Sequence, residues 1–437
     1  MKASFYNIYT KNKKNILCYN TKNDVFCLLT PKDYELLRND PAQLVQESPR
    51  VYAKLQELRF VVEDDADEYK ELCDEYRAAI YNPAVCYLTL LPSLDCNLRC
   101  WYCFEKHVKG SHLTPENAQA ILTYVRRLWD EHPELTFLNV EMFGGEPLLY
   151  FREELYPLLE QIQREAEERG RKASFFFVTN GVCITPDTLP LFDKLHASFQ
   201  ISIDGFKDRH DQVKYLPDTH EGTYDGMIAT ILRLTRELEN TYINLRINYD
   251  DETLPHMKDL IQDLLEVDRR KIGVHLERVW QTGNFINYDN EELKSVINLW
   301  MLNGFRVSYM NLGRRSFSCK ASARNQAVIS YDGAVYKCSG RDFTPAHQEG
   351  RLSADGCLHW EEEKLARRMG IVTYDNDMCR RCKLMPLCWG PCCQKQLEAA
   401  PEEFGRFCQK QHMELSMADY MRYRFNNACI EASLRKS

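Results

Sequence analysis

Three cysteines stand close together in the run CNLRCWYC, at Cys96, Cys100 and Cys103. One loop of this length can gather three thiolates around a single cubane, and soft thiolate ligands suit an iron–sulfur cluster. Three protein ligands leave the fourth iron open, so that iron can bind a substrate or a cofactor. The alternatives are a zinc site or cysteines that are merely reduced.

The spacing CX3CX2C, with Tyr102 before the last cysteine, resembles the signature of the radical SAM superfamily, whose members cleave S-adenosylmethionine (SAM). The resemblance implies that Cys96, Cys100 and Cys103 are the catalytic residues and hold a [4Fe–4S] cluster. It also implies that Tyr102 belongs to the SAM site. The cluster would pass an electron to the SAM sulfonium and generate a 5′-deoxyadenosyl radical.

A glycine pair and a carboxylate follow the second predicted strand, in Gly144–Gly145–Glu146–Pro147. Glycines let backbone groups approach a ligand, and Glu146 can accept a hydrogen bond from an ammonium group. The segment resembles the GGE element of radical SAM enzymes, which implies that it binds the methionine amino group of SAM. An ordinary turn from strand to helix is the alternative.

The fourth predicted strand ends in Ser202–Ile203–Asp204, and alternation places Ser202 and Asp204 on one face. The resemblance implies that this segment and Lys214, in the next loop, contact the carboxylate and ribose of SAM. Three further polar residues are expected at the mouth of the same pocket, although each could equally be a structural residue at the end of the barrel: Asn180, Arg246 and Asn248.

Seven cysteines form an ordered series in the last third of the chain, with the spacings CX13GX4C and CX2CX5CX3C and one cysteine downstream. The series resembles the SPASM domain, which we expect over residues 306–437 and which holds two auxiliary [4Fe–4S] clusters, giving three clusters in all. A pair of zinc sites is the alternative. The resemblance assigns Cys379, Cys382, Cys388 and Cys408 to the outer cluster, and Cys319, Cys338 and Cys392 to the inner cluster.

The inner cluster is one ligand short in this assignment. The stretch after Cys319 contains no further cysteine before Cys338, so the local candidates are Cys357 and Cys393. Cys357 falls in an expected hairpin, and Cys393 would have to reach the same cluster as its neighbour Cys392. An open iron, as in some thioether-forming relatives, is the third possibility.

An α/β fold positions these motifs. Six strand-like runs alternate with helical runs over residues 84–305, which predicts parallel βα units and a partial (β/α)6 TIM-like barrel. Functional residues then lie at the carboxyl ends of the strands. The six runs are CYLTLLPSL, FLNVEMF, SFFFVTN, SFQISID, INLRINY and IGVHLERV.

Residues 1–80 form a separate unit with a winged-helix-like pattern. Three short strands are expected, the last two joined by a turn over residues 20–24, followed by a helix that begins at Thr30–Pro31. The acidic stretch 63–76 is expected to be a solvated connecting helix. The unit resembles the PqqD-like element that binds the leader of a precursor peptide by adding it to an edge strand. A merely structural cap on the barrel is the alternative.

Composition excludes several classes of function. A net charge of -8 does not favour binding to nucleic acid or to anionic lipid, and no apolar run is long enough to span a membrane. The N-terminal residues lack the features of a secretory signal, so we expect a cytoplasmic protein. Its 18 cysteines then stay reduced, which favours metal ligands over disulfides.

Together these features predict a SAM-dependent oxidoreductase that modifies a ribosomally synthesised precursor peptide (RiPP) by a thioether or carbon–carbon crosslink. The expected partners are the leader of that peptide and a small electron donor such as flavodoxin or ferredoxin. A sulfatase-maturase-like enzyme is one alternative, weakened because Ser339 stands after Cys338 where those enzymes tend to carry aspartate. A zinc-rich binding protein without enzymatic activity is the other.

Overall fold

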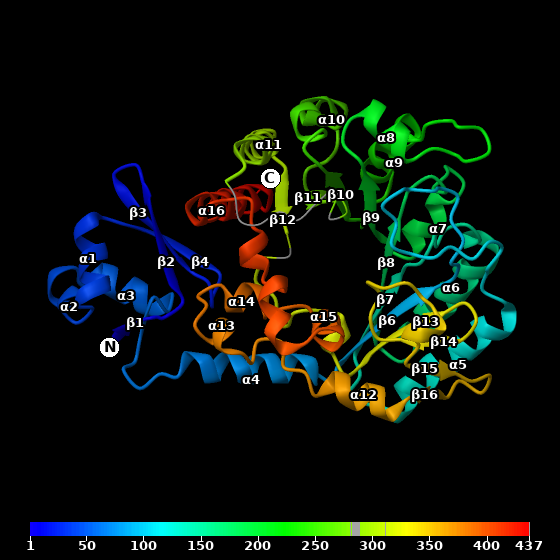
Figure 1. Cartoon of the computed structure of the whole chain (residues 1–437), viewed down its shortest axis with the longest axis horizontal. Helices are drawn as coiled ribbons and strands as arrows, with labels where there is room; N and C mark the ends of the chain where they lie inside the picture. The colour runs from blue at the N-terminus through cyan, green and yellow to red at the C-terminus, as the bar shows by residue number, and fades with distance from the viewer. Residues whose placement is uncertain (280, 282–288, 311, 437) are drawn as a thin grey trace.

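The structure is a computed structural model that describes residues 1–279, 281, 289–310 and 312–436. Its centre is an open, mostly parallel sheet with helices packed outside it (Figure 1). The six predicted strands are confirmed and lie side by side in chain order. They are β6 (Val85–Leu91), β7 (Phe137–Met142), β8 (Lys172–Thr179), β9 (Ser198–Ile203), β10 (Ile243–Tyr249) and β11 (Ile272–Arg278).

Two further parallel strands extend this sheet at its two sides. β12 (Arg306–Tyr309) pairs with β11, and β13 (Gln326–Ser330) pairs with β6. β13 then turns back into β14 (Ala334–Tyr336), β15 (Gly350–Leu352) and β16 (Leu358–Trp360), all antiparallel. The cysteine-rich region therefore begins as part of the same sheet that carries the predicted barrel strands.

Amphipathic helices cover the sheet between successive strands. In α5 (Pro115–Glu131) the predicted cap is present: the Thr114 side chain accepts a hydrogen bond from Asn117 N. Its apolar face buries Ile121, Val125 and Trp129 against the strands, and each large side chain removed from water in this way stabilises the fold by about 1.5–3 kcal/mol. The other covering helices are α6 (Tyr156–Glu168), α7 (Leu189–Lys194), α8 (Lys207–Val213), α9 (Tyr224–Glu237), α10 (Met257–Asp263) and α11 (Glu291–Leu302).

The last hundred residues contain short helices and turns, as their lack of apolar periodicity predicts. Only the final helix is long, and it packs beside α11 and β12. Among the described helices, none is long and apolar enough to cross a membrane. The helices are α12 (Glu362–Met369), α13 (Asp377–Arg380), α14 (Met385–Cys388), α15 (Cys393–Glu398) and α16 (Met417–Leu434).

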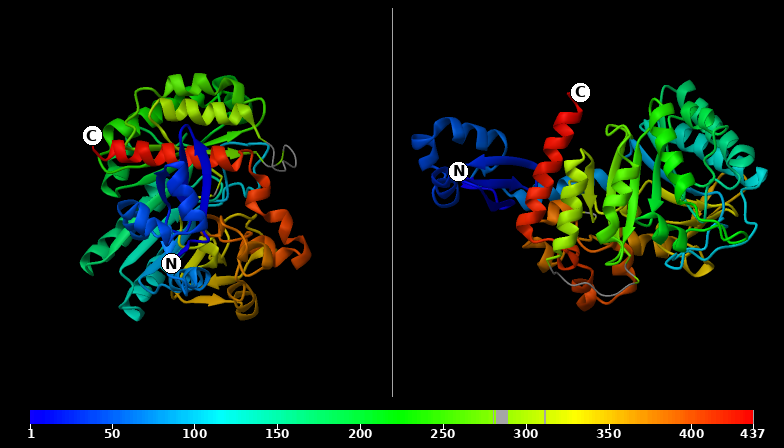
Figure 2. Two further views of the ribbon diagram at one scale, coloured as in Figure 1. Left: turned by 90° about the vertical axis from the view of Figure 1, so that its left-hand side faces the viewer. Right: turned by 90° about the horizontal axis from the view of Figure 1, so that it is seen from above.

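The N-terminal unit contains the predicted strands, β2 (Asn7–Asn12), β3 (Asn15–Asn20) and β4 (Val25–Leu29), in an antiparallel sheet. Thr30 caps α1 (Pro31–Asn39) as expected, and α2 (Gln43–Glu47) and α3 (Pro49–Glu57) follow. The short β1 (Lys2–Ala3) pairs with β5 (Val61–Val62). The unit projects to one side of the molecule and meets α16, where the Phe26 and Phe425 rings are 5.7 Å apart (Figure 2).

The acidic connecting helix is present as α4 (Glu68–Ile80), but the expectation that it is solvated all round is wrong. Glu68, Leu72, Tyr76 and Ile80 are buried, because a spacing of four residues places them on one face. The Tyr76 ring packs 4.8 Å from Tyr374 in the cysteine-rich region. The other acidic residues of the helix lie away from this buried face, and their number in the sequence hid the buried stripe.

Candidate functional site

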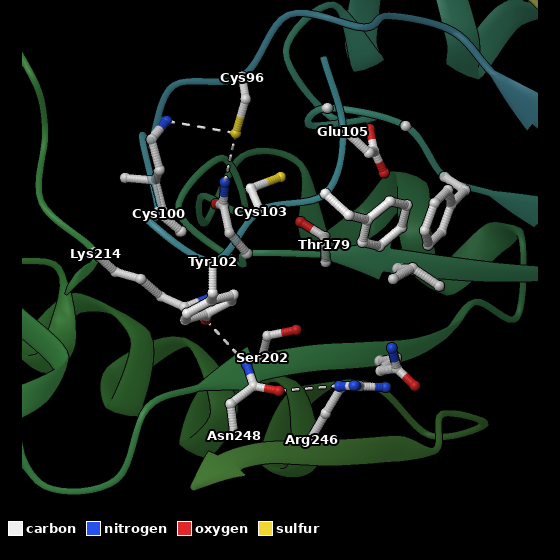
Figure 3. A pocket seen from close by; sticks show the side chains of 18 of the residues that line it. Cys96, Cys100, Tyr102, Cys103, Glu105, Thr179, Ser202, Lys214, Arg246 and Asn248 are labelled. Carbon is white, nitrogen blue, oxygen red and sulfur yellow. Dashed lines mark hydrogen bonds between the residues drawn. The ribbon is translucent and has the colours of Figure 1, made fainter. Parts of the chain in front are cut away.

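The loop after β6 brings the three predicted cysteines to one cavity. Cys96, Cys100 and Cys103 line a cavity of about 250 Å³ at the carboxyl ends of the central strands (Figure 3). Burial raises the pKa of Cys96 to about 12 and that of Cys103 to about 11. The thiols are free, so a cluster that binds here must displace their protons. Three thiols on the wall of one cavity fit the donor set of an iron–sulfur cluster.

Asp95 holds this cysteine loop in shape. Its carboxylate accepts hydrogen bonds from Cys96 N and Gly110 N, each at 2.8 Å, and its carbonyl accepts one from Glu146 N at 2.8 Å. Sequence reasoning missed this residue, although an aspartate that begins an irregular loop often bonds nearby backbone N–H groups.

The two glycines after β7 pack directly against the cysteine loop. A Cβ atom at Gly145 would lie 2.1 Å from the Asp95 carbonyl oxygen, and one at Gly144 would lie 2.5 Å from the Ser93 oxygen. Both residues also line the cavity. Glycine is therefore required at both positions so that the two backbone segments can pack closely. The sequence had indicated only that these glycines let a ligand approach the backbone.

Glu146 joins the loop after β7 to the end of β8. Its side chain is fully buried and accepts hydrogen bonds from Thr179 Oγ1 at 2.7 Å, Asn180 N at 2.8 Å and Leu148 N at 3.1 Å. Burial raises the pKa of its carboxyl group. Glu146 is not among the residues that line the cavity, so its predicted contact with the SAM amino group stays a prediction.

Four predicted residues from separate segments form one network at the wall of the cavity, which Tyr102, Lys214 and Asn248 line. The Tyr102 hydroxyl donates to Asp204 Oδ1 at 2.6 Å and accepts from Asn248 Nδ2 at 3.0 Å. Lys214 Nζ lies 3.7 Å from Asp204 Oδ2. Burial opposes the charge of Lys214, but Asp204 and the cluster thiols outweigh it and raise the lysine pKa, so the side chain is a buried cation.

Most of the predicted residues at the strand ends line the cavity, but one lies behind its wall. Ser202, Lys214 and Arg246 line the cavity, whereas Asp204 does not. Arg246 Nε donates to Asn248 Oδ1 at 3.1 Å. Asn180 also lines the cavity, and its Nδ2 lies 3.8 Å from Cys96 Sγ.

Several polar residues of the wall were not found from the sequence, among them Gln200 and Glu105. Gln200 lies two residues before Ser202 on the same face of β9, so strand alternation could have indicated it. Glu105 Oε2 is buried without a hydrogen-bond partner among the described residues. Burial, with a smaller contribution from Glu146, raises the pKa of Glu105 to about 8.

The four cysteines assigned to the outer cluster lie together, about a small cavity of about 30 Å³. We call Cys319, Cys338 and Cys392 the inner group. Cys319 directly precedes the short turn Lys320–Ser322, which contacts α15, and Cys392 directly precedes α15. Burial raises the pKa of Cys338, and the neighbouring Cys319 and Cys392 add to the rise. Within the described residues, no three His, Cys, Asp or Glu side chains stand close enough to hold a single metal ion. The outer four are Cys379, Cys382, Cys388 and Cys408.

Comparisons with known proteins agree with this geometry. Residues 90–264 match the sequence profile of the Radical SAM superfamily. The chain is similar to the radical SAM cyclopropyl synthase TigE of Paramaledivibacter caminithermalis, with 25% identity over 73% of this chain and 69% of TigE. It is also similar to the cysteine-type anaerobic sulfatase-maturating enzyme of Clostridium perfringens, with 23% identity over 75% of this chain and 94% of that enzyme.

The fold is similar to a solved structure, that of Streptococcus suis SuiB bound to its precursor peptide SuiA. The TM-score is 0.50 at 15% identity, over 91% of this chain and 97% of SuiB. At this level of identity the likeness shows the fold, with its central mostly parallel sheet.

Proposed function

We propose that this chain, whose residues 90–264 match the Radical SAM superfamily profile, is a radical SAM enzyme that modifies a ribosomally synthesised precursor peptide. The observation that carries the proposal is one cavity lined by Cys96, Cys100 and Cys103 together with Lys214 and Arg246. SuiB, whose solved structure holds its precursor peptide SuiA and whose fold is similar to that of this chain, supports a peptide substrate. A thioether or carbon–carbon crosslink is the proposed product, formed in the cytoplasm with electrons from a flavodoxin or ferredoxin.

The residues of the cavity have separate tasks in this proposal. A [4Fe–4S] cluster on the three thiolates supplies the electron that cleaves SAM to methionine and a 5′-deoxyadenosyl radical. Lys214 and Arg246 place two positive charges where the SAM carboxylate binds. Ser202 and Gln200 offer hydrogen bonds to the ribose. The radical abstracts a hydrogen atom from the peptide, and exclusion of water from the cavity by the bound substrate would protect it.

Two auxiliary [4Fe–4S] clusters, on the outer cysteines and on the inner group, belong to the same proposal. The thiols of each set are neighbours, and the free state of every cysteine is the one that cluster binding requires. The outer cysteines and the inner group would each hold one cluster, and such clusters would supply an acceptor for the electron that the substrate radical releases when the new bond closes.

We assign leader binding to the edge strand β4 of the N-terminal unit. Among the described residues, the β4 backbone forms hydrogen bonds to β3 alone, so its other edge can receive an extended peptide. Leu28 on this strand is 46% exposed and offers an apolar contact for an alternate side chain of the leader.

Cleavage of SAM tests the enzymatic part of the proposal. The full chain is reconstituted anaerobically with iron and sulfide and incubated with SAM and dithionite, and 5′-deoxyadenosine is measured by mass spectrometry. The Cys100→Ala variant is expected to produce none, whereas Cys357→Ala, outside every proposed cluster, retains the wild-type rate. A colourless zinc-loaded protein, or production by Cys100→Ala, would contradict the proposal.

Peptide binding tests the substrate. The open reading frames beside the gene are searched for a short precursor peptide, which is labelled, and its binding to the full chain is followed by fluorescence anisotropy. We expect Leu28→Asp to weaken binding at least tenfold. Val45→Asp, on α2 and also 46% exposed, is the matched control and leaves binding unchanged.

A sulfatase-maturase-like activity is the second candidate, because the sulfatase-maturating enzyme of Clostridium perfringens is similar to this chain over most of its own length. Such an enzyme acts on a protein without a leader. Equal binding of peptides with and without the leader segment would favour this candidate over the precursor-peptide maturase.

A further inference from the structure

A histidine on β11 joins a carboxylate to a serine. His275 Nε2 donates a hydrogen bond to Glu277 Oε2 at 2.9 Å, and its Nδ1 accepts one from Ser308 Oγ on β12 at 2.8 Å. Strand geometry explains the arrangement, because Glu277 stands two residues after His275 on the same face of β11 and Ser308 is the register partner of His275. The chain of three side chains therefore fixes the position of the Glu277 carboxylate.

Glu277 lies at the end of this chain that is nearer to the cavity. It pairs in register with Asn248 of β10, which lines the cavity, and register partners on neighbouring strands share one face of a sheet. Figure 3 shows Asn248 and Arg246 side by side at this part of the wall. The Glu277 side chain is 29% exposed, so the protein does not close it off from a ligand.

The Glu277 carboxylate is charged and has one oxygen to spare. Burial opposes its charge, but the hydrogen bond from His275 and the positive charge of Arg246 outweigh burial and lower the pKa of Glu277. Oε2 accepts from His275, whereas Oε1 has no hydrogen-bond partner among the described residues. A carboxylate oxygen in this state can accept a proton from a bound molecule.

The other carboxyl groups around the cavity are engaged or enclosed. Glu146 accepts three hydrogen bonds from the protein, Asp204 belongs to the Tyr102 network, and neither lines the cavity. Glu105 does line it, but this residue follows Cys103 by two positions and its Oε2 is enclosed by protein. Glu277 is therefore the carboxylate that a peptide in the cavity can best use.

We propose that Glu277 accepts the proton that the peptide releases when its crosslink closes, and that His275 is the positioning residue that holds Glu277 in place. The inference rests on the proposed function and deepens it. In that reaction the 5′-deoxyadenosyl radical takes a hydrogen atom from one C–H bond of the peptide. Closure then forms a C–S or C–C bond and breaks an S–H or second C–H bond, which releases one proton and one electron. Glu277 Oε1 takes the proton, and an auxiliary [4Fe–4S] cluster takes the electron.

The test compares two yields of the reconstituted full chain, which is supplied with SAM, dithionite and the precursor peptide found beside the gene. Crosslinked peptide and 5′-deoxyadenosine are both measured by mass spectrometry. We expect Glu277→Gln to form 5′-deoxyadenosine at nearly the wild-type rate and to lower the number of crosslinks per 5′-deoxyadenosine about a hundredfold. The matched control is Glu252→Gln, whose side chain is 80% exposed after β10, and it leaves both yields unchanged.

Further measurements separate a proton acceptor from a group with a structural role. Glu277→Gln should bind the labelled peptide as tightly as the wild type, and rapid freezing should trap an organic radical, detected by electron paramagnetic resonance, that the wild type does not accumulate. Formate added to Glu277→Ala should restore crosslinking, because it supplies a carboxylate in the space that the side chain leaves. His275→Gln should lower the crosslinks per 5′-deoxyadenosine less than Glu277→Gln does.

The outcomes distinguish this inference from the proposed function. A wild-type number of crosslinks per 5′-deoxyadenosine in Glu277→Gln would overturn the inference, and so would a folded Glu277→Ala that formate does not rescue. If Glu277→Gln fails to fold, Glu277→Asp is used instead and should keep part of the crosslinking. A wild-type chain that forms no 5′-deoxyadenosine, or forms it without changing the peptide, would refute the proposed function itself.

Discussion

The Tyr102 hydroxyl donates a hydrogen bond of 2.6 Å to Asp204 Oδ1 and so joins the cysteine loop to the end of β9. Asn248 Nδ2, from β10, reaches the same hydroxyl at 3.0 Å. Desolvation and the Asp204 charge raise the pKa of Tyr102, so the phenol remains a donor. The cysteine loop, the end of β9 and the end of β10 thus share one hydrogen-bond network at the wall of the cavity.

Replacement of Tyr102 by phenylalanine removes both bonds and leaves Asp204 with fewer donors. We expect Tyr102→Phe to lower the free energy of unfolding by about 1 kcal/mol, measured by urea denaturation, because the buried Asp204 Oδ1 loses one of its two donors and retains only Asn248 Nδ2 at 3.2 Å. The rate of 5′-deoxyadenosine formation should fall in parallel. Tyr81→Phe is the control, since Tyr81 is 47% exposed and its change should alter neither quantity. An unchanged stability of Tyr102→Phe would contradict the importance of the network.

Gly145 faces backbone, so a single methyl group there should be disruptive. A Cβ atom would stand 2.1 Å from the Asp95 carbonyl oxygen, and main chain cannot move aside as a flexible side chain can. Gly145→Ala should abolish SAM cleavage and lower the melting temperature. Gly226→Ala, on α9 with open space around it, should be neutral or slightly stabilising. Full activity of Gly145→Ala would show that the cysteine loop can shift without loss of function.

His210 predicts a pH dependence of stability. Its Nδ1 accepts from Asp204 N at 3.2 Å and its Nε2 donates to Thr223 Oγ1 at 3.1 Å, which only the neutral ring can do. Burial lowers the pKa of His210 to about 3, against an ordinary value of 6.5. Below that ordinary value the unfolded chain binds a proton that the folded protein refuses, so stability falls as the pH drops.

The size of this effect is about 1.4 kcal/mol at pH 5.5, one unit below the ordinary histidine pKa. Urea denaturation at pH 7.5 and 5.5 should show a smaller loss for His210→Gln than for the wild type. His359→Gln, at an exposed imidazole, should retain the wild-type difference. Equal losses in wild type and His210→Gln would exclude His210 as the source.

Arg315 lies between the two auxiliary sets of cysteines. Burial lowers its pKa, and the smaller effects of Cys388 and Cys319 oppose that decrease. Its Nη2 is buried without a hydrogen-bond partner in the described part of the chain. Removal of a nearby positive charge makes a cluster harder to reduce. Arg315→Met should therefore lower the midpoint potential of an auxiliary cluster in a redox titration.

The neighbouring Arg314→Met is the matched control, because Arg314 pairs with Glu75 on α4 at 2.8 Å and does not face the thiols. Its midpoint potentials should equal those of the wild type. A shift of the same size in both variants would assign the effect to overall charge and not to the position of Arg315.

The parts of this site that could be predicted are those that depend on local sequence patterns. Alternation and short cysteine spacings identified the six strands, the thiols and the residues at the strand ends, because each depends on neighbours in the sequence. Asp95, Glu105 and Arg315 were missed, since their roles arise from contacts between segments far apart in the chain. The same limit concealed the buried face of α4, whose partner Tyr374 lies some three hundred residues later. The need for glycine at position 145 could not be predicted either, because the close contact is with Asp95, which lies in a different segment of the chain.

The pairing of β13 with β6 has a mechanical consequence. β6 leads directly into the cysteine loop, and β13 leads from the Cys319 segment toward Cys338, with five residue pairs in register between the two strands. Adjacent hydrogen-bonded strands resist both sliding and separation, so the sheet fixes the distance between the cavity and the inner group. Electron transfer between them would then proceed over a fixed gap. Any motion that admits a peptide then comes from loops, and not from a hinge between the strands β6–β12 and the cysteine-rich region.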